Sequence, residues 1–121
     1  MRYVGYFTEL PHGDSSGRSL RDARGELPQH LVAPAVRYLT GGAPLAAAAC
    51  YAYDELDPAR PEIAPLAILT DGDWSWPSDL PYYVQRYRVG LPADFLHHAQ
   101  ALGWNPPRLG IEQLERLSEQ W

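Results

Sequence analysis

Apolar residues recur with a period near 3.6 in four parts of the chain, a spacing typical of helices that pack one face against a core. The predicted helices cover about residues 28–40, Ser78 to Tyr87, Leu91 to Gly103, and a last segment from about Gly110 that presents Ile111, Leu114, Leu117 and Trp121. The Gly41-Gly42 pair favours the end of the first helix, because glycine adopts the left-handed conformation that closes many helices. Pro34 would interrupt that helix, so its regular part could begin only there.

Two apolar runs, Leu66 to Leu69 and Trp74 to Trp76, flank an Asp71-Gly72 turn. Asp-Gly between apolar runs is typical of a β-hairpin with a tight turn whose central residues both adopt positive φ. Arg2 to Phe7 mixes polar residues with large apolar ones that favour strands, and a hairpin needs a third strand for stability. The sequence therefore predicts a small antiparallel sheet made of the hairpin over 66–76 and this N-terminal strand.

The remaining segments carry weaker patterns. Residues Pro11 to Glu26 are rich in glycine, serine and charge, and are expected to form an exposed loop with a helical turn near Ser19 to Arg24. Residues Ala43 to Pro65 contain four prolines and are expected to form a connection without regular elements. The fold class that follows is α+β, in one domain over residues 1–121, with the sheet packed against about four helices.

Trp74 and Trp76 are two positions apart, so on a strand both side chains point to the same face. We expect them to anchor the core together with Tyr83, Tyr87 and Phe95, since large aromatic rings dominate the energetics of burial. The alternative is an exposed aromatic platform, because Trp and Tyr are also favoured anchors of protein interfaces.

Composition removes several classes of function. The formal net charge of −5 would repel a phosphate backbone, which argues against direct nucleic-acid binding. No apolar run approaches the length of a membrane span. Cys50 is the single cysteine, and the first residues lack the charged and apolar regions of a secretory signal, so we expect a cytoplasmic protein without an internal disulfide.

The sequence also argues against a metal or cofactor. Asp71 and Asp73 flank Gly72 as in the start of a calcium loop, but the later ligand positions are taken by Trp and Pro. His97 and His98 are adjacent, so on a helix they point about 100° apart and cannot hold one ion together. No metal or cofactor site is predicted.

Acidic residues gather in the segment between the predicted helix over about residues 28–40 and the predicted hairpin over residues 66–76. Asp54, Glu55 and Asp57, followed by Glu62, are expected to form a solvated acidic rim. Together with Asp71 and Asp73 they could bind the basic surface of a partner protein, since opposite potentials speed encounter and set orientation. We take Asp54, Glu55, Asp57, Asp71 and Asp73 as the candidate partner-binding residues.

One long segment resembles a family of small bacterial proteins. The residues that carry the resemblance are Leu69-Thr70-Asp71-Gly72-Asp73-Trp74-Ser75-Trp76-Pro77-Ser78-Asp79-Leu80, then Tyr82-Tyr83-Val84, Tyr87, and Leu91-Pro92 with Phe95. Proteins of this kind look like the immunity proteins of polymorphic-toxin systems, which bind and neutralise a cognate toxin. The resemblance implies a shared fold more than a shared activity, and it brings no catalytic residues.

Three functions follow as expectations. The first is a non-enzymatic protein-binding module, an immunity protein that neutralises a toxin through an acidic and aromatic surface. The second is a small hydrolase in which His30, His97 or His98 works with Cys50 or a carboxylate across a cleft. The third is a structural or regulatory module that oligomerises.

Overall fold

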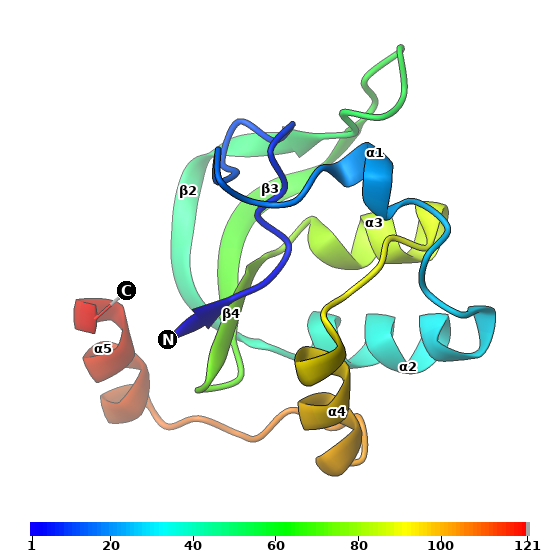
Figure 1. Ribbon diagram of the computed structural model, residues 1–121. Coiled ribbons are helices and arrows are strands. Elements are labelled where there is room, and N and C mark those ends of the chain that lie inside the picture. Colours follow the sequence, from blue (N-terminus) through cyan, green and yellow to red (C-terminus); the bar gives the residue numbers. More distant parts are fainter. Residues whose placement is uncertain (121) are drawn as a thin grey trace.

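A four-stranded sheet lies at the centre of the computed structural model, which describes residues 1–120 (Figure 1). The strands are β1 (Arg2–Tyr3), β2 (Ala43–Tyr53), β3 (Glu62–Thr70) and β4 (Trp74–Pro77), in the order β1-β4-β3-β2. The hairpin of β3 and β4 confirms the sequence prediction. The antiparallel expectation is wrong for β1, which pairs parallel with β4, so the sheet is mixed.

Within residues 1–120 the sheet is accompanied by five helices: α1 (Leu20–Ala23), α2 (Gln29–Thr40), α3 (Leu80–Tyr87), α4 (Ala93–Ala101) and α5 (Ile111–Gln120). Helices α2, α3 and α4 lie together on one side, where α2 packs against both α3 and α4 (Figure 1). Helix α5 lies on the other side and packs against β2. The α+β class and the four long helices are therefore confirmed.

The N-terminal strand is shorter than predicted. Backbone pairing with β4 covers only Arg2 and Tyr3. Gly5 has a φ of +87°, a conformation that L side chains rarely adopt and that turns the chain out of the strand. The close approach of Leu80 leaves no room for a Cβ there either, so Gly5 also lets α3 pack against this turn.

The longest strand was not predicted. Residues 43–53 were expected to lack regular structure, yet they form the eleven-residue β2. Alanine has a low strand propensity and Pro44 cannot donate to a ladder, so the local signal for this strand is weak. Pairing with β3 supplies what local propensity does not. The register shifts between Ala47 and Tyr51. Ala47 pairs with Ala67 and Tyr51 pairs with Pro65, so four residues of β2 advance past only two residues of β3.

Proline does not delay the start of α2. The helix begins at Gln29 and continues through Pro34 to Thr40, so the expectation that its regular part could begin only at Pro34 is wrong. Tyr38 and Leu39, one turn further on, are fully buried. Burial of this face compensates for the backbone hydrogen bond that Pro34, which lacks an N–H, cannot donate.

Two tryptophans and a phenylalanine form the centre of the core. The ring of Phe95 on α4 meets Trp74 edge-on with centroids 5.2 Å apart and Trp76 with centroids 5.8 Å apart, so both indoles lie on one face of β4. Trp76 is fully buried and its Nε1 donates to the carbonyl of Leu39, 3.0 Å away. Tyr83 is fully buried as well, and Tyr87 packs against the core while partly exposed.

The segment over residues 11–26 is mostly exposed, as expected, but it is fastened at α1. Leu20 and Ala23 are fully buried in the core. The carboxylate of Glu9 accepts hydrogen bonds from the backbone N–H groups of Leu20, at 2.6 Å, and Arg21, at 3.0 Å, and from the hydroxyl of Ser19. The loop is therefore tied to the start of α1 by one charged side chain.

This tie predicts a pH-dependent stability. Burial alone would raise the pKa of Glu9, but hydrogen bonds from Arg21, Leu20 and Ser19 lower it from 4.5 to about 2. The folded pKa lies below the unfolded one, so the ionised carboxylate stabilises the fold above about pH 4.5, and this contribution is lost as the pH falls toward 2. Urea unfolding at a series of pH values should therefore show a weaker acid dependence in Glu9→Gln than in the parent protein. The same dependence in both, or an equal change in the exposed control Asp22→Asn, would contradict this role.

The ends of two helices differ from expectation. The hydroxyl of Ser78 does not cap α3; it accepts a hydrogen bond from the backbone N–H of Ala67 on β3, at 2.8 Å. On α5, Ile111 is 77% exposed, and none of the residues from Ile111 to Gln120 is buried. Trp121, expected on the same apolar stripe, lies outside the described residues. None of the helices within residues 1–120 combines the length and apolar character needed to cross a bilayer.

Candidate functional site

The five candidate carboxylates do not share one surface. Asp54 is buried, with an exposed fraction of 0%, so the expectation that it belongs to a solvated acidic rim is wrong. Asp71 is also buried, with an exposed fraction of 2%, so it is not the accessible partner-binding carboxylate that was expected. Glu55 and Asp57 are partly exposed, and Asp73 points into solvent with 73% of its side chain exposed. The two buried groups and the three accessible ones are therefore treated separately.

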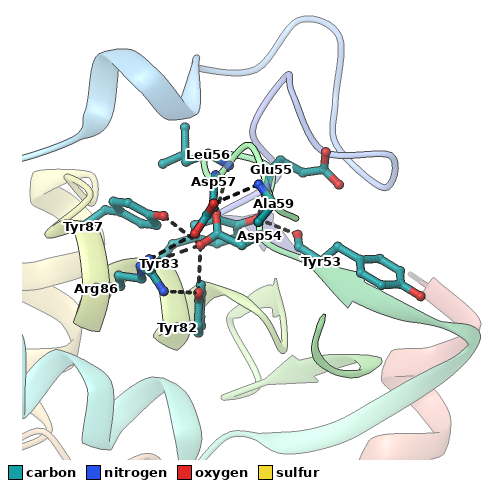
Figure 2. Close-up of polar contacts among 10 residues, drawn as sticks. All are labelled: Tyr53, Asp54, Glu55, Leu56, Asp57, Ala59, Tyr82, Tyr83, Arg86 and Tyr87. Atoms are coloured by element: carbon teal, nitrogen blue, oxygen red, sulfur yellow. Dashed lines mark hydrogen bonds and ion pairs between the residues drawn. The ribbon is translucent and has the colours of Figure 1, made fainter. Parts of the chain in front are cut away.

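Asp54 is the centre of a polar network that joins the β2–β3 loop to α3 (Figure 2). Its Oδ2 accepts hydrogen bonds from the phenol groups of Tyr82 and Tyr87, each at 2.7 Å. Its Oδ1 accepts from the backbone N–H groups of Leu56, at 2.9 Å, and Asp57, at 3.2 Å. Both oxygens are thus used within the fold, and this carboxylate holds the loop in shape.

The protonation states of this network are fixed by the same contacts. Burial alone would raise the pKa of Asp54, but the hydrogen bonds from Tyr87 and Tyr82 help to lower it below its usual range. Burial and the bond to Asp54 raise the pKa of Tyr87 to about 12. Asp54 therefore stays ionised and Tyr87 protonated near neutral pH, which suits a structural tie and not a general base.

Further contacts fasten the same loop. The hydroxyl of Tyr83 donates to the carbonyl of Tyr53 and accepts from the backbone N–H of Glu55, both at 3.0 Å (Figure 2). Glu55 also forms an ion pair with Arg60, at 2.7 Å. Asp57 in turn pairs with Arg86 on α3, at 3.2 Å. Glu55 and Asp57 are therefore engaged with cations of the chain itself.

Asp71 performs a similar task at the turn between β3 and β4. Its Oδ1 accepts hydrogen bonds from the backbone N–H groups of Asp73, at 2.9 Å, and Trp74, at 2.7 Å. Its Oδ2 accepts from the phenol of Tyr38 on α2 and lies 3.1 Å from Nε2 of His98 on α4. One carboxylate thus connects the hairpin to both helices.

The turn itself differs from the one predicted. Gly72 has a φ of +102°, whereas Asp71 is not among the residues with positive φ, so the two central residues do not share the conformation expected for a type I′ turn. The loop is closed instead by the Asp71 side chain and by the hydrogen bond from the Asp71 N–H to the carbonyl of Trp74, at 3.2 Å.

A second imidazole lies beside a buried carboxylate. Nε2 of His12 is 3.0 Å from Oδ2 of Asp79, whose side chain is almost fully buried at the start of α3. The N-terminal segment thus approaches that helix closely, although the two groups are not aligned for a hydrogen bond. His12 also lines a hollow of about 340 Å³ together with Tyr3, Tyr6, Gly13 and Asp14. Sequence reasoning missed this pair because its members are far apart in the chain and follow no motif.

An uncharged, exposed surface runs along β2. All five residues from Ala47 to Tyr51 are exposed, and no residue of β2 carries a charge. Tyr51 is 52% exposed, and Tyr53 is exposed as well. Because β2 is the outer strand of the sheet and α5 packs against it with Ile111 open to solvent, we name β2 and α5 together the β2–α5 surface (Figure 1).

Acidic residues flank the β2–α5 surface. On α5 the side chains of Glu112, Glu115 and Glu119 are exposed, and Glu62 is exposed at the start of β3. Arg116 is the one basic residue of α5. Large apolar side chains and an excess of acid therefore occur together here, and of the acidic residues named from the sequence this group includes Glu62.

Comparison with known proteins adds no functional assignment: no protein-family model matches the chain, and no curated protein or solved structure matches it. The geometry of the described residues is therefore the basis for the function.

Proposed function

We propose that this chain is a non-enzymatic protein-binding module that uses the β2–α5 surface to bind a partner protein with a basic surface. The observation that carries the proposal is the run of exposed, uncharged residues on the outer strand, Ala47 to Tyr51. Charged side chains are one of the features that protect exposed outer strands, and this one has none. An apolar edge of this kind is typical of a surface that another molecule covers.

The partner is expected to make contact chiefly through side chains. The register shift between Ala47 and Tyr51 interrupts the regular ladder and disfavours the addition of a full strand. Tyr51 and Ile111 instead offer exposed apolar area, and tyrosine is one of the residue types that dominate binding energy. The small alanine side chains beside Tyr51 leave space for bulky groups of a partner.

Charge determines the chemistry of the partner. Glu112, Glu115 and Glu119 are exposed on α5 and Glu62 is exposed at the start of β3, and the chain as a whole carries a net charge of −5. Complementary potentials favour a basic protein and make association weaker at high salt. The immunity-type role implied by the sequence resemblance fits this proposal, with a cytoplasmic toxin or enzyme as the partner.

The hydrolase alternative finds less support in the geometry. Cys50 is exposed on β2, and within residues 1–120 no hydrogen bond joins it to an imidazole. His98 does lie beside a carboxylate, that of Asp71, but this carboxylate is already held by the phenol of Tyr38 and by two backbone N–H groups. The proposal therefore rests on the exposed surface of β2 and α5.

Site-specific photo-crosslinking tests the proposal. A photoreactive phenylalanine analogue placed at Tyr51 should yield one dominant protein adduct in cells of the native host, and high salt should reduce the yield in their extract. The same analogue at Asp22, exposed on α1, serves as the control. With the identified partner purified, Tyr51→Ser should weaken binding by about tenfold or more. Equal adducts at both positions, or unchanged affinity of Tyr51→Ser, would contradict the proposal.

A further inference from the structure

Three atoms able to bind a metal meet where the β3–β4 turn faces α4. They are Oδ2 of Asp71, Oδ2 of Asp73 and Nε2 of His98, and all lie within 4.8 Å of one another. Nε2 of His98 is 3.1 Å from the Asp71 oxygen and 3.7 Å from the Asp73 oxygen. Adjacency to His97 predicts no shared ion, and no sequence motif joins His98 to ligands 25 and more positions away along the chain.

We propose that Asp71, Asp73 and His98 form a binding site for one divalent transition-metal ion of the zinc class. Zinc binds carboxylate oxygen and imidazole nitrogen at about 2.0–2.2 Å, and tetrahedral geometry then separates neighbouring ligand atoms by about 3.3–3.6 Å. The two separations of 3.1 Å and 3.7 Å lie on either side of that range. The Asp71 and Asp73 oxygens lie within 4.8 Å of each other, and the exposed Asp73 side chain is the ligand that can adjust its position to complete the coordination.

The ligand at the centre of the site is held in place before any ion binds. Oδ1 of Asp71 accepts two backbone hydrogen bonds, from Asp73 and Trp74, so the carboxylate cannot rotate freely. The phenol of Tyr38 donates to Oδ2, the oxygen that would bind the ion. Hydrogen bonds of this kind orient metal ligands and tune their affinity.

The solvent-exposed side of the site leaves room for a fourth ligand to the metal ion. Asp73 projects into solvent, His98 is partly exposed, and Asp71 is buried. An ion held by these three side chains would face water on the Asp73 side, where a water molecule can supply a fourth ligand. Three protein ligands and one open position are typical of accessible zinc sites.

The ligand types select the class of metal. Calcium requires six to eight oxygen ligands, and magnesium keeps an octahedral shell of oxygens, so neither suits a site with one imidazole and two carboxylates. Imidazole favours zinc and its neighbours in the first transition series. A bound ion would fasten the β3–β4 turn to α4, which already share the contact between Asp71 and His98. This proposal does not depend on the proposed function.

Calorimetry with zinc chloride on the purified full-length chain tests the site, using Co²⁺ absorption as a second readout of coordination. The parent protein should bind one ion per chain, and the cobalt complex should show the visible bands of a tetrahedral site. His98→Gln and Asp73→Asn should each weaken zinc binding by about tenfold or more. His97→Gln, which removes the exposed neighbouring imidazole, and Asp22→Asn should bind as the parent does.

Asp73→Asn changes an exposed side chain, so it keeps the test decisive if His98→Gln does not fold. Zinc should also raise the unfolding temperature of the parent and of His97→Gln, but not that of Asp73→Asn. The proposal is overturned if the parent does not bind zinc, if Asp73→Asn binds it equally well, or if affinity depends on His97 instead.

Discussion

Trp76→Ala is expected to lower the free energy of unfolding by about 3–5 kcal/mol, because it empties the centre of the core. The indole is fully buried, and it packs against Tyr38 and Phe95. Gly42 approaches it so closely that a Cβ there would lie 2.6 Å from the indole ring, so the backbone has little freedom to fill the space. A domain of this length has a total stability of roughly 6–18 kcal/mol, so the loss is a large part of the whole.

Chemical denaturation of matched variants checks this expectation. Trp76→Phe retains a ring but leaves the carbonyl of Leu39 without its indole donor, so its loss should be smaller, about 1–3 kcal/mol. Tyr51→Ala, at an exposed ring, should change stability by no more than about 0.5 kcal/mol. If Trp76→Ala and Tyr51→Ala had similar effects, Trp76 would not be the anchor of the core.

Asp54→Ala should lower the free energy of unfolding by about 3 kcal/mol, the second large effect. The substitution removes a buried, charged acceptor and leaves its four hydrogen-bond donors without a partner. Two of these donors are the phenols of Tyr82 and Tyr87, and two are backbone N–H groups of the β2–β3 loop. Hydrogen bonds to a charged group contribute more than neutral ones, and the unpaired backbone groups add to the loss. The loop should also become more mobile, with faster amide exchange at Leu56 and Asp57.

Two further variants separate charge from shape. Asp54→Asn keeps the size and one oxygen acceptor, so its loss of stability should lie between those of the parent and Asp54→Ala. Asp57→Asn removes a partly exposed ion pair with Arg86 and should cost no more than about 1 kcal/mol. Urea denaturation of the three variants gives the order, and a loss in Asp57→Asn as large as that in Asp54→Ala would contradict a special role for the buried carboxylate.

The elements predicted correctly are those with a strong local signal. Helices α3 and α4 have apolar residues at helical spacing and prolines in positions that start a helix, and Asp71-Gly72 marks the β3–β4 turn. The strand β2 has no comparable signal, because alanine and proline do not favour strands. Its structure comes from pairing with β3, which no local pattern along residues 43–53 expresses.

The burial of Asp54 and Asp71 could not be predicted from the sequence for a related reason. Asp54 meets Tyr82 and Tyr87 across 28 and 33 positions of the chain, and Asp71 meets His98 across 27. A sequence shows that a residue is acidic, and an acidic residue is exposed by default. These charges are buried because side chains of α2, α3 and α4 and backbone N–H groups of the two loops converge on them, so the candidate binding site could not be separated from the structural ties in advance.

We propose that structure and binding are divided between two sets of residues. Asp54 and Asp71 hold loops to helices, whereas the β2–α5 surface is the proposed contact with the partner. This division allows the two properties to be changed independently, since Asp54 is buried and Tyr51 is exposed.

The most direct test measures both properties, unfolding free energy and affinity for the partner identified by crosslinking, in Asp54→Asn and Tyr51→Ser. We predict that Asp54→Asn lowers stability and binds the partner as the parent does under conditions where it is folded, while Tyr51→Ser keeps its stability and loses affinity. The opposite pattern, with affinity lost in Asp54→Asn and retained in Tyr51→Ser, would contradict the account.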